Sequence, residues 1–113
     1  MPQASQETLD FLRRRRSRPA KTLTTPVPEA AELRDLLTIA ARTPDHGKLE
    51  PWRFLVLERP ALERLAEAVA PHGHLAGIAE DRLAKMERQF AEAHLAVVVV
   101  SSPKPSETIP EIE

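Results

Sequence analysis

Residues 42–57 read RTPDHGKLEPWRFLVL and lead from the end of a predicted helix into a predicted strand. Before them, Leu and Ala recur between Leu33 and Ala41 at the i, i+3, i+4, i+7 and i+8 spacing of a core-facing stripe. This spacing predicts a helix over residues 28–42, which Pro44 ends. Residues 53–57 read as a short strand. The polar segment between them is therefore a loop carried on two regular elements, where binding residues often lie.

Outward from this stretch, the pattern predicts three further helices and one further strand. The helices cover residues 6–15, 60–70 and 78–90, with a loop at 71–77. Residues 96–100 include four consecutive valines, typical of a strand buried on both faces. The order α-α-β-α-α-β indicates an α/β (α+β) fold with a mixed sheet flanked by helices.

Two strands alone make a poor sheet, because both outer edges stay unpaired. Residues 110–113 also read as the start of another helix, with Pro in the first turn and acidic residues following. We therefore interpret residues 1–113 as the N-terminal portion of a single domain, whose sheet is incomplete in this chain.

The composition excludes several classes of site. The sequence has no Cys, so disulfides, thiolate zinc sites, iron–sulfur clusters and a thiol nucleophile are all absent. His72 and His74 form an H-x-H pair without a third ligand at a suitable spacing, and we predict no metal site. The longest apolar run, Leu95 to Val100, is too short to span a bilayer. We expect a soluble, cytoplasmic protein.

Positive charge is concentrated in one segment. Six of the 16 basic residues, and no acidic residue, lie between Arg13 and Lys21. The rest of the chain has 10 basic and 17 acidic residues, a net charge of −7. Because nucleic-acid binders usually spread basic residues over a whole face, a small polyanion bound at one place fits this distribution better.

Two polar segments are candidates for chemistry. In the first, Arg15, Arg16 and Ser17 offer guanidinium and hydroxyl donors suited to a phosphate. The same residues are also compatible with a solvated helix end, or with a localisation or nucleic-acid signal. The second segment combines Arg42 and His46 with Lys48 and Trp52, and it also fits an ordinary connection in which Trp52 anchors the core.

Together, the two segments resemble the nitroreductase family of flavin enzymes. The resemblance rests on four parts in order: a first helix running into Arg15-Arg16-Ser17, a helix ending Ala40-Ala41-Arg42, then Thr43-Pro44-Asp45-His46, and Pro51-Trp52-Arg53-Phe54 entering a strand. The Pro-Asp-His form looks most like the small, single-domain subgroup of NAD(P)H nitroreductases. The resemblance covers essentially the whole chain but only the N-terminal part of the family's domain, a three-layer sandwich.

The resemblance implies a homodimer with FMN at the subunit interface. Hydride would pass from NAD(P)H through FMN to a nitroaromatic, a quinone or a similar small-molecule acceptor. By position, Arg15, Arg16 and Ser17 would hold the FMN phosphate and ribityl chain, while Arg42 and His46 would reach the flavin bound mainly by the partner subunit. Since the cofactor performs the chemistry, no catalytic side chain is assigned. Neither a membrane nor a nucleic acid is expected as a partner.

Three positions depart from the family pattern. Pro19 stands where many members have the last arginine of R-R-S-x-R, Glu50 where Gln is usual, and Lys48 where many relatives have Asn. Two other functions therefore stay open. One is a non-enzymatic flavin-binding relative, and the other is a module that binds nucleic acid or an acidic partner through its basic arm.

Overall fold

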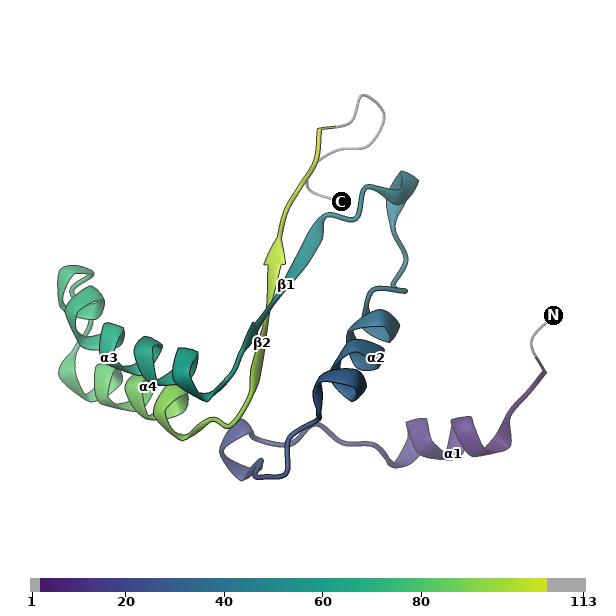
Figure 1. Ribbon diagram of the computed structural model, residues 1–113, viewed down its shortest axis with the longest axis horizontal. Helices are drawn as coiled ribbons and strands as arrows, with labels where there is room; N and C mark the ends of the chain where they lie inside the picture. Colours follow the sequence, from purple (N-terminus) through teal and green to yellow (C-terminus); the bar gives the residue numbers. More distant parts are fainter. Residues whose placement is uncertain (1–2, 106–113) are drawn as a thin grey trace.

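The computed structural model of the protein describes residues 3–105. Its elements are α1 (Gln6–Arg14), η1 (Ala20–Thr22), α2 (Ala30–Ala40), η2 (His46–Lys48), β1 (Trp52–Leu57), α3 (Arg59–Leu75), α4 (Glu80–Glu92) and β2 (Ala96–Ser101) (Figure 1). The predicted helices and both predicted strands are confirmed within a few residues at their ends. The helix predicted to start at residue 110 lies outside the described residues.

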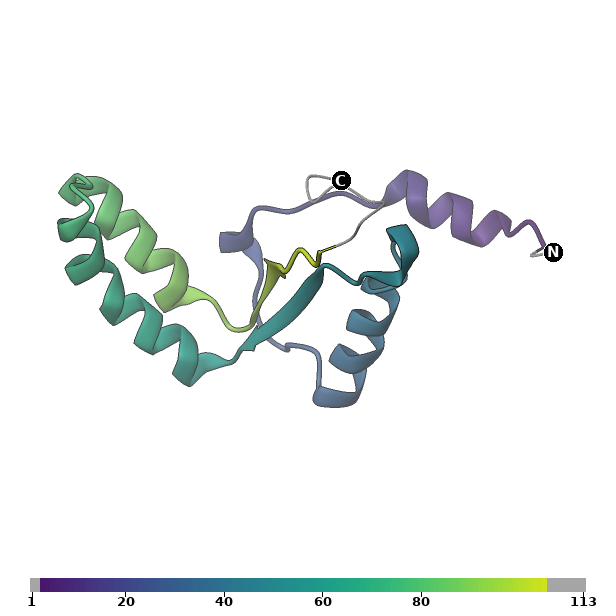
Figure 2. The same cartoon turned by 90° about the horizontal axis from the view of Figure 1, so that it is seen from above.

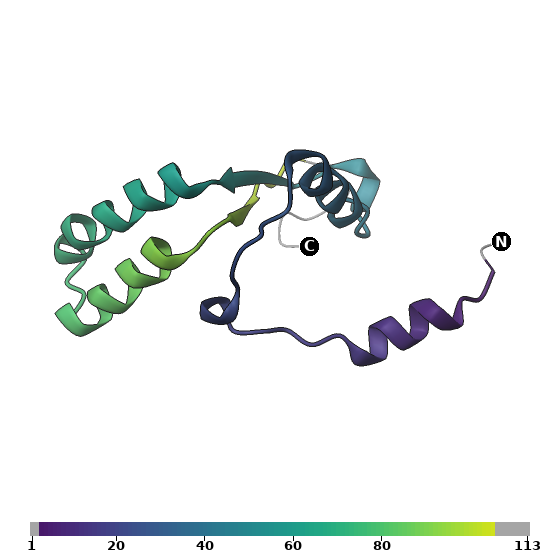
Figure 3. The ribbon, with the colours of Figure 1, turned by 60° about the horizontal axis from the view of Figure 1, so that its bottom comes forward.

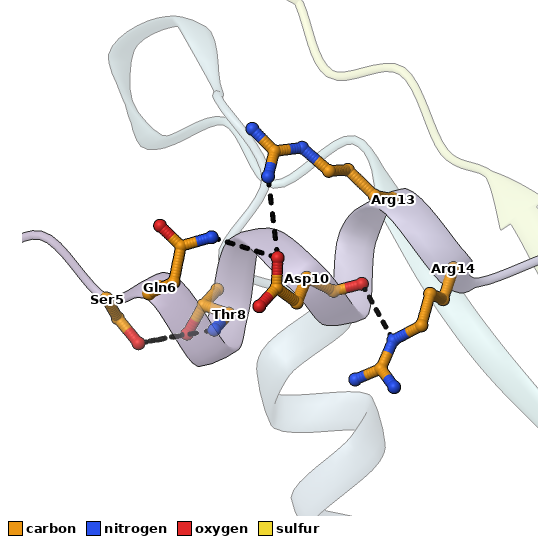
Figure 4. Close-up of polar contacts among 6 residues, drawn as sticks. All are labelled: Ser5, Gln6, Thr8, Asp10, Arg13 and Arg14. Atoms are coloured by element: carbon orange, nitrogen blue, oxygen red, sulfur yellow. Dashed lines mark hydrogen bonds and ion pairs between the residues drawn. The ribbon is translucent and has the colours of Figure 1, made fainter.

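The first two helices begin with caps that the sequence encodes. The Ser5 hydroxyl accepts a hydrogen bond from the Thr8 backbone N–H at 3.2 Å, which satisfies a donor that the first turn of α1 leaves unpaired (Figure 4). In α2, Glu29 and Glu32 form a reciprocal capping box. Local sequence therefore sets where both helices start.

The two strands pair in antiparallel register, from Trp52 opposite Ser101 to Leu57 opposite Ala96. The expected mixed sheet is thus not seen among residues 3–105, which form only this antiparallel pair. The reason is the connection between the strands: α3 leads away from β1 and α4 returns beside it, so β2 runs back along β1 (Figures 1 and 2).

The predicted loop at residues 71–77 is wrong, because α3 continues through Pro71 to Leu75. Proline removes a helical hydrogen bond and strains the preceding turn. Here the helix is supported by tertiary packing that the local sequence does not reveal. Gly73 is buried against Leu83 of α4, and only beyond Ala76 does Gly77 leave the helix, with φ of 73°.

The buried hydrophobic side chains of the described residues are Leu62 and Ala66 of α3 and Leu83 of α4, two helices that pack together. At helical spacing within α3, Leu62 and Ala66 are buried, whereas Leu65, which the spacing places on the same face, is 37% exposed. Leu36, which the spacing places on the core-facing stripe of α2, is instead 52% exposed. The expectation is wrong for Leu36 in residues 3–105, whereas Leu33 and Leu37 of the same stripe are half-buried and line an apolar pocket beside β1.

The valine strand is formed. Its composition predicts burial on both faces, and this prediction is wrong for residues 3–105. Val97, Val98 and Val99 are all exposed, Val99 to 66%. Residues 3–105 do not provide a layer that covers these side chains or a strand that pairs with the outer edge of β2. β-Branched apolar residues still favour a strand here, since that preference depends on the pleated backbone as well as on burial.

The chain is extended for its size. Its radius of gyration is 18.4 Å, whereas a compact protein of this length has about 13 Å. The helical hairpin of α3 and α4 projects on one side of the sheet, and α1 lies apart on the other (Figures 1 and 3). None of the helices described is both long and apolar enough to cross a membrane.

Candidate functional site

The first candidate segment begins where α1 ends. Arg15 has extended backbone angles, φ −60° and ψ 145°, and its N–H donates to the Phe11 carbonyl at 2.9 Å. The chain leaves the helix at this residue, so the side chains that follow are exposed to solvent. Nη2 of Arg15 donates to Oγ of Ser17 at 3.1 Å. The structure therefore brings together a guanidinium and a hydroxyl, the donor types that bind phosphate oxygens.

Arg16 makes different contacts. Its Nη1 donates to the carbonyl oxygens of Arg13 and Arg15, at 3.0 and 2.9 Å. The last carbonyls of a helix have no intrahelical partner, and a cation is favourable beside them. In this structure Arg16 serves the end of α1, which is the solvated helix-end alternative considered for this segment.

The arginines within α1 are held by Asp10. Nη1 of Arg13 lies 3.4 Å from its carboxylate, and Nε of Arg14 donates to its backbone carbonyl at 3.2 Å (Figure 4). The four consecutive arginines thus make two kinds of contact. Arg13, Arg14 and Arg16 bond to oxygens of the helix, and Arg15 bonds to the serine hydroxyl.

The second segment is a tight turn between α2 and β1. Arg42 is exposed just after α2, and its N–H donates to the Ile39 carbonyl at 3.1 Å. His46 begins η2, and the predicted flavin contact of its side chain lies outside what the structure describes. Trp52 is half-buried at the start of β1 and does not join the buried α3–α4 core.

This turn contains backbone features that the sequence analysis missed. Lys48 and Glu50 have positive φ, 55° and 47°, in the left-handed region that L-residues rarely adopt. A carboxylate oxygen of Asp45 accepts from the Glu50 N–H at 2.8 Å and closes the loop. An Asp followed closely by a Gly is a turn signal, so the Asp45 bond was accessible from sequence. The conformation of Lys48 was not.

The two candidate segments do not meet within one chain. Figures 1 and 3 show α1 and its C-terminal end well separated from η2. Among the described residues, α1 makes little contact with the rest of the chain, and η1 in the connector lies against α4. This separation is compatible with the prediction that Arg42 and His46 serve a flavin held mainly by the other subunit. The site assignments remain predictions.

Comparison with known proteins agrees with the layout of these motifs. The profile of the nitroreductase family matches residues 12–108, and the chain belongs to this family. It is 33% identical over 100 residues to a Haemophilus influenzae protein named "Putative NAD(P)H nitroreductase", which covers 88% of this chain and 53% of the relative. It is 32% identical over 108 residues to "Putative NAD(P)H nitroreductase YdjA" of Escherichia coli K12, which covers 95% of this chain and 57% of the relative.

The family resemblance predicted from the four motifs is therefore confirmed. The chain spans little more than half the length of these relatives. The matched region includes both candidate segments, Arg15–Ser17 and Arg42–His46.

Proposed function

We propose that the chain is part of an FMN-dependent oxidoreductase, which transfers hydride from NAD(P)H to a nitroaromatic, a quinone or a similar acceptor. Membership of the nitroreductase family and the names of the two relatives support an oxidoreductase that uses NAD(P)H. One observation of this chain's own geometry supports the cofactor: the Arg15 guanidinium and the Ser17 hydroxyl lie 3.1 Å apart at an exposed helix end.

These two groups fit the phosphate of FMN chemically. A phosphate monoester is a dianion that takes hydrogen bonds from several donors at once, and a guanidinium supplies two parallel ones. The serine hydroxyl can rotate, so it can give its own proton to a phosphate oxygen while it accepts from Arg15. Arg16 is expected to support the site by bonding to the carbonyls at the end of α1. A direct contact between Arg16 and the phosphate is a separate prediction.

The proposed enzyme is a homodimer in which the two segments complete one site from different copies. Arg15, Arg16 and Ser17 of one subunit hold the phosphate and ribityl chain, and Arg42 and His46 of the partner reach the flavin ring. A bound FMN supplies the hydride chemistry, so the protein's task is to bind and orient it. A cation near the ring also stabilises negative charge there, more strongly where water is excluded.

The test is an absorbance spectrum of the purified protein, followed by titration with FMN and by NADH and NADPH oxidation assays. We expect flavin bands, saturable FMN binding and oxidation of a nicotinamide when an electron acceptor is present. FMN binding without reduction by either nicotinamide would instead identify a flavin-binding relative without this activity. A protein that binds no FMN, but binds nucleic acid with a steep dependence on salt, would contradict the proposal.

A further inference from the structure

The turn between α2 and β1 is closed by a side-chain hydrogen bond. Oδ2 of Asp45 accepts from the backbone N–H of Glu50 at 2.8 Å. The bond joins residues five positions apart, so it closes a ring around residues 46–49. The ring includes η2 and lies between α2 and β1 (Figure 1). Asp45 is half-buried, whereas Glu50 is exposed. The Asp45 carboxylate therefore holds the two ends of the ring together.

The backbone of this ring has an uncommon conformation. Gly47, Lys48 and Glu50 all have positive φ, of 63°, 55° and 47°. Glycine adopts such angles readily, but a residue with a Cβ does so at a cost in free energy. Two such residues so close together persist only where surrounding contacts determine the backbone. The Asp45 carboxylate bonds to Glu50 itself, so it is a contact that can hold this conformation.

Glu50 is also bonded to the start of the sheet. Its carbonyl accepts from the Trp52 N–H at 2.8 Å, and the Pro51 carbonyl accepts from the Ser102 N–H at 2.7 Å. The N–H and the carbonyl of Glu50 are thus both paired, one with Asp45 and the other with β1. Because a carboxylate is a stronger acceptor than a neutral oxygen, the Asp45 bond fixes the ring relative to the strand.

We propose that Asp45 is a positioning residue for His46, the residue that follows it and the first in the ring. The inference rests on the proposed function, in which His46 reaches the flavin held mainly by the partner subunit, and it assigns Asp45 no contact with the cofactor. A misplacement of about 1 Å at a binding group can cost a large part of its effect. Arg42 is a contrast, because it precedes the ring and its N–H bonds to the Ile39 carbonyl of α2.

A small set of substitutions in the full-length protein separates positioning from other roles. Asp45→Ala removes the acceptor, whereas Asp45→Asn keeps an acceptor oxygen and loses only the charge. Asp35→Ala is the matched control, because Asp35 is exposed on α2 and its loss removes the same charge. His46→Ala, alone and combined with Asp45→Ala, completes a double-mutant cycle.

The first measurement needs no cofactor. Amide hydrogen exchange, followed by NMR, reports whether the Glu50 N–H is bonded. We expect this amide to exchange at least about tenfold faster in Asp45→Ala than in the wild type, and near the wild-type rate in Asp45→Asn and Asp35→Ala. An unchanged Glu50 rate in Asp45→Ala would show that the turn keeps its conformation without the carboxylate, and would overturn the inference.

The second measurement is the affinity for FMN, by fluorescence titration. We expect Asp45→Ala to weaken FMN binding by about fivefold, and by less than about twofold when it is combined with His46→Ala, because Asp45 acts through that residue. Asp45→Asn should keep most of the wild-type affinity, and Asp35→Ala all of it.

Two outcomes of the titration would overturn the inference alone. Equal losses in Asp45→Ala and Asp45→Asn would show that the charge of Asp45 matters rather than its hydrogen bond. Additive losses in the cycle would show that Asp45 does not act through His46. A wild-type protein that binds no FMN would instead contradict the proposed function, and the role of Asp45 toward the flavin with it.

Discussion

Nη1 of Arg59 donates a hydrogen bond of 2.8 Å to the backbone carbonyl of Ala91, 32 residues later in the chain. It also donates to the carbonyl of Ala93, and Nη2 of the same guanidinium bonds to Glu63 at 3.1 Å. The last carbonyls of α4 have no partner within the helix, so Arg59 satisfies them. β1 ends at Leu57, just before α3, and β2 begins at Ala96, just after α4. The contact therefore joins the start of α3 to the end of α4, next to the sheet.

Replacing Arg59 by Ala should lower the free energy of unfolding by about 1–2 kcal/mol, since hydrogen bonds from a charged donor are lost and carbonyls are left unpaired. The Arg59 side chain is 38% exposed, which places the expected value toward the lower end of the range for charged donors. Urea unfolding measures the effect. Arg64→Ala, an exposed arginine on the same helix, is the matched control, and an equal loss in both variants would contradict the role given to Arg59.

Gly73 allows α3 and α4 to approach closely. A Cβ at this position would lie 2.0 Å from Cδ2 of Leu83, whose side chain is 2% exposed and has little room to move. Gly73→Ala should therefore destabilise the protein by about 1–2 kcal/mol, even after the gain in helix propensity.

A double-mutant cycle with Leu83→Ala tests this cause. We expect the double variant to be clearly more stable than the sum of the two single losses predicts, because removing the leucine side chain removes the clash. Additive losses in thermal or urea unfolding would show that Gly73 acts through some other contact.

Arg15 and Ser17 should affect cofactor binding more than stability. We expect Arg15→Ala to weaken FMN binding by about 10–100-fold and Ser17→Ala by about fivefold, from the usual free energies of charged and neutral hydrogen bonds. Fluorescence titration with FMN measures both. The control is Arg14→Ala. This change removes the same charge from the neighbouring residue, whose side chain bonds to the Asp10 carbonyl. Unchanged FMN affinity in the Arg15 and Ser17 variants would remove them from the site.

Lys48 is expected to lower the free energy of unfolding, because its φ of 55° places a residue with a side chain in the left-handed region. Lys48→Gly should raise the free energy of unfolding by up to about 1 kcal/mol, once the greater freedom of glycine in the unfolded chain is allowed for. Lys48→Ala keeps the Cβ and should give no such gain. If both variants shift the urea midpoint equally, backbone strain is not the reason.

Most of the elements were predictable from sequence because their causes are local. Leu62 and Ala66 lie at helical spacing in α3, and their burial together with Leu83 of α4 agrees with the apolar periodicity of both helices. The prediction of a loop at 71–77 was wrong because it relied on Pro71 and Gly73, which are both poor helix formers. The local pattern does not contain the contact of Gly73 with Leu83.

The candidate site was predictable in part. The sequence identified Arg15 and Arg16 together as phosphate donors, but the structure separates their contacts, with Arg15 on the Ser17 hydroxyl and Arg16 on helix carbonyls. Residue type alone cannot make this distinction. It depends on where the helix ends and on which carbonyls are left without partners.

The sequence by itself determined the family, through motifs at Arg15–Ser17 and Arg42–Phe54 whose order and spacing are read directly, and it determined the helices and strands, through periodicity and caps. Only the tertiary structure decided that α3 runs through Pro71, that Leu36 and the central valines of β2 are exposed, and that α1 stands apart from α2. The physical reason is that spacing and propensity act between near neighbours in the chain. Burial is decided by which distant surfaces are present to cover a side chain, and one-dimensional patterns do not contain that information.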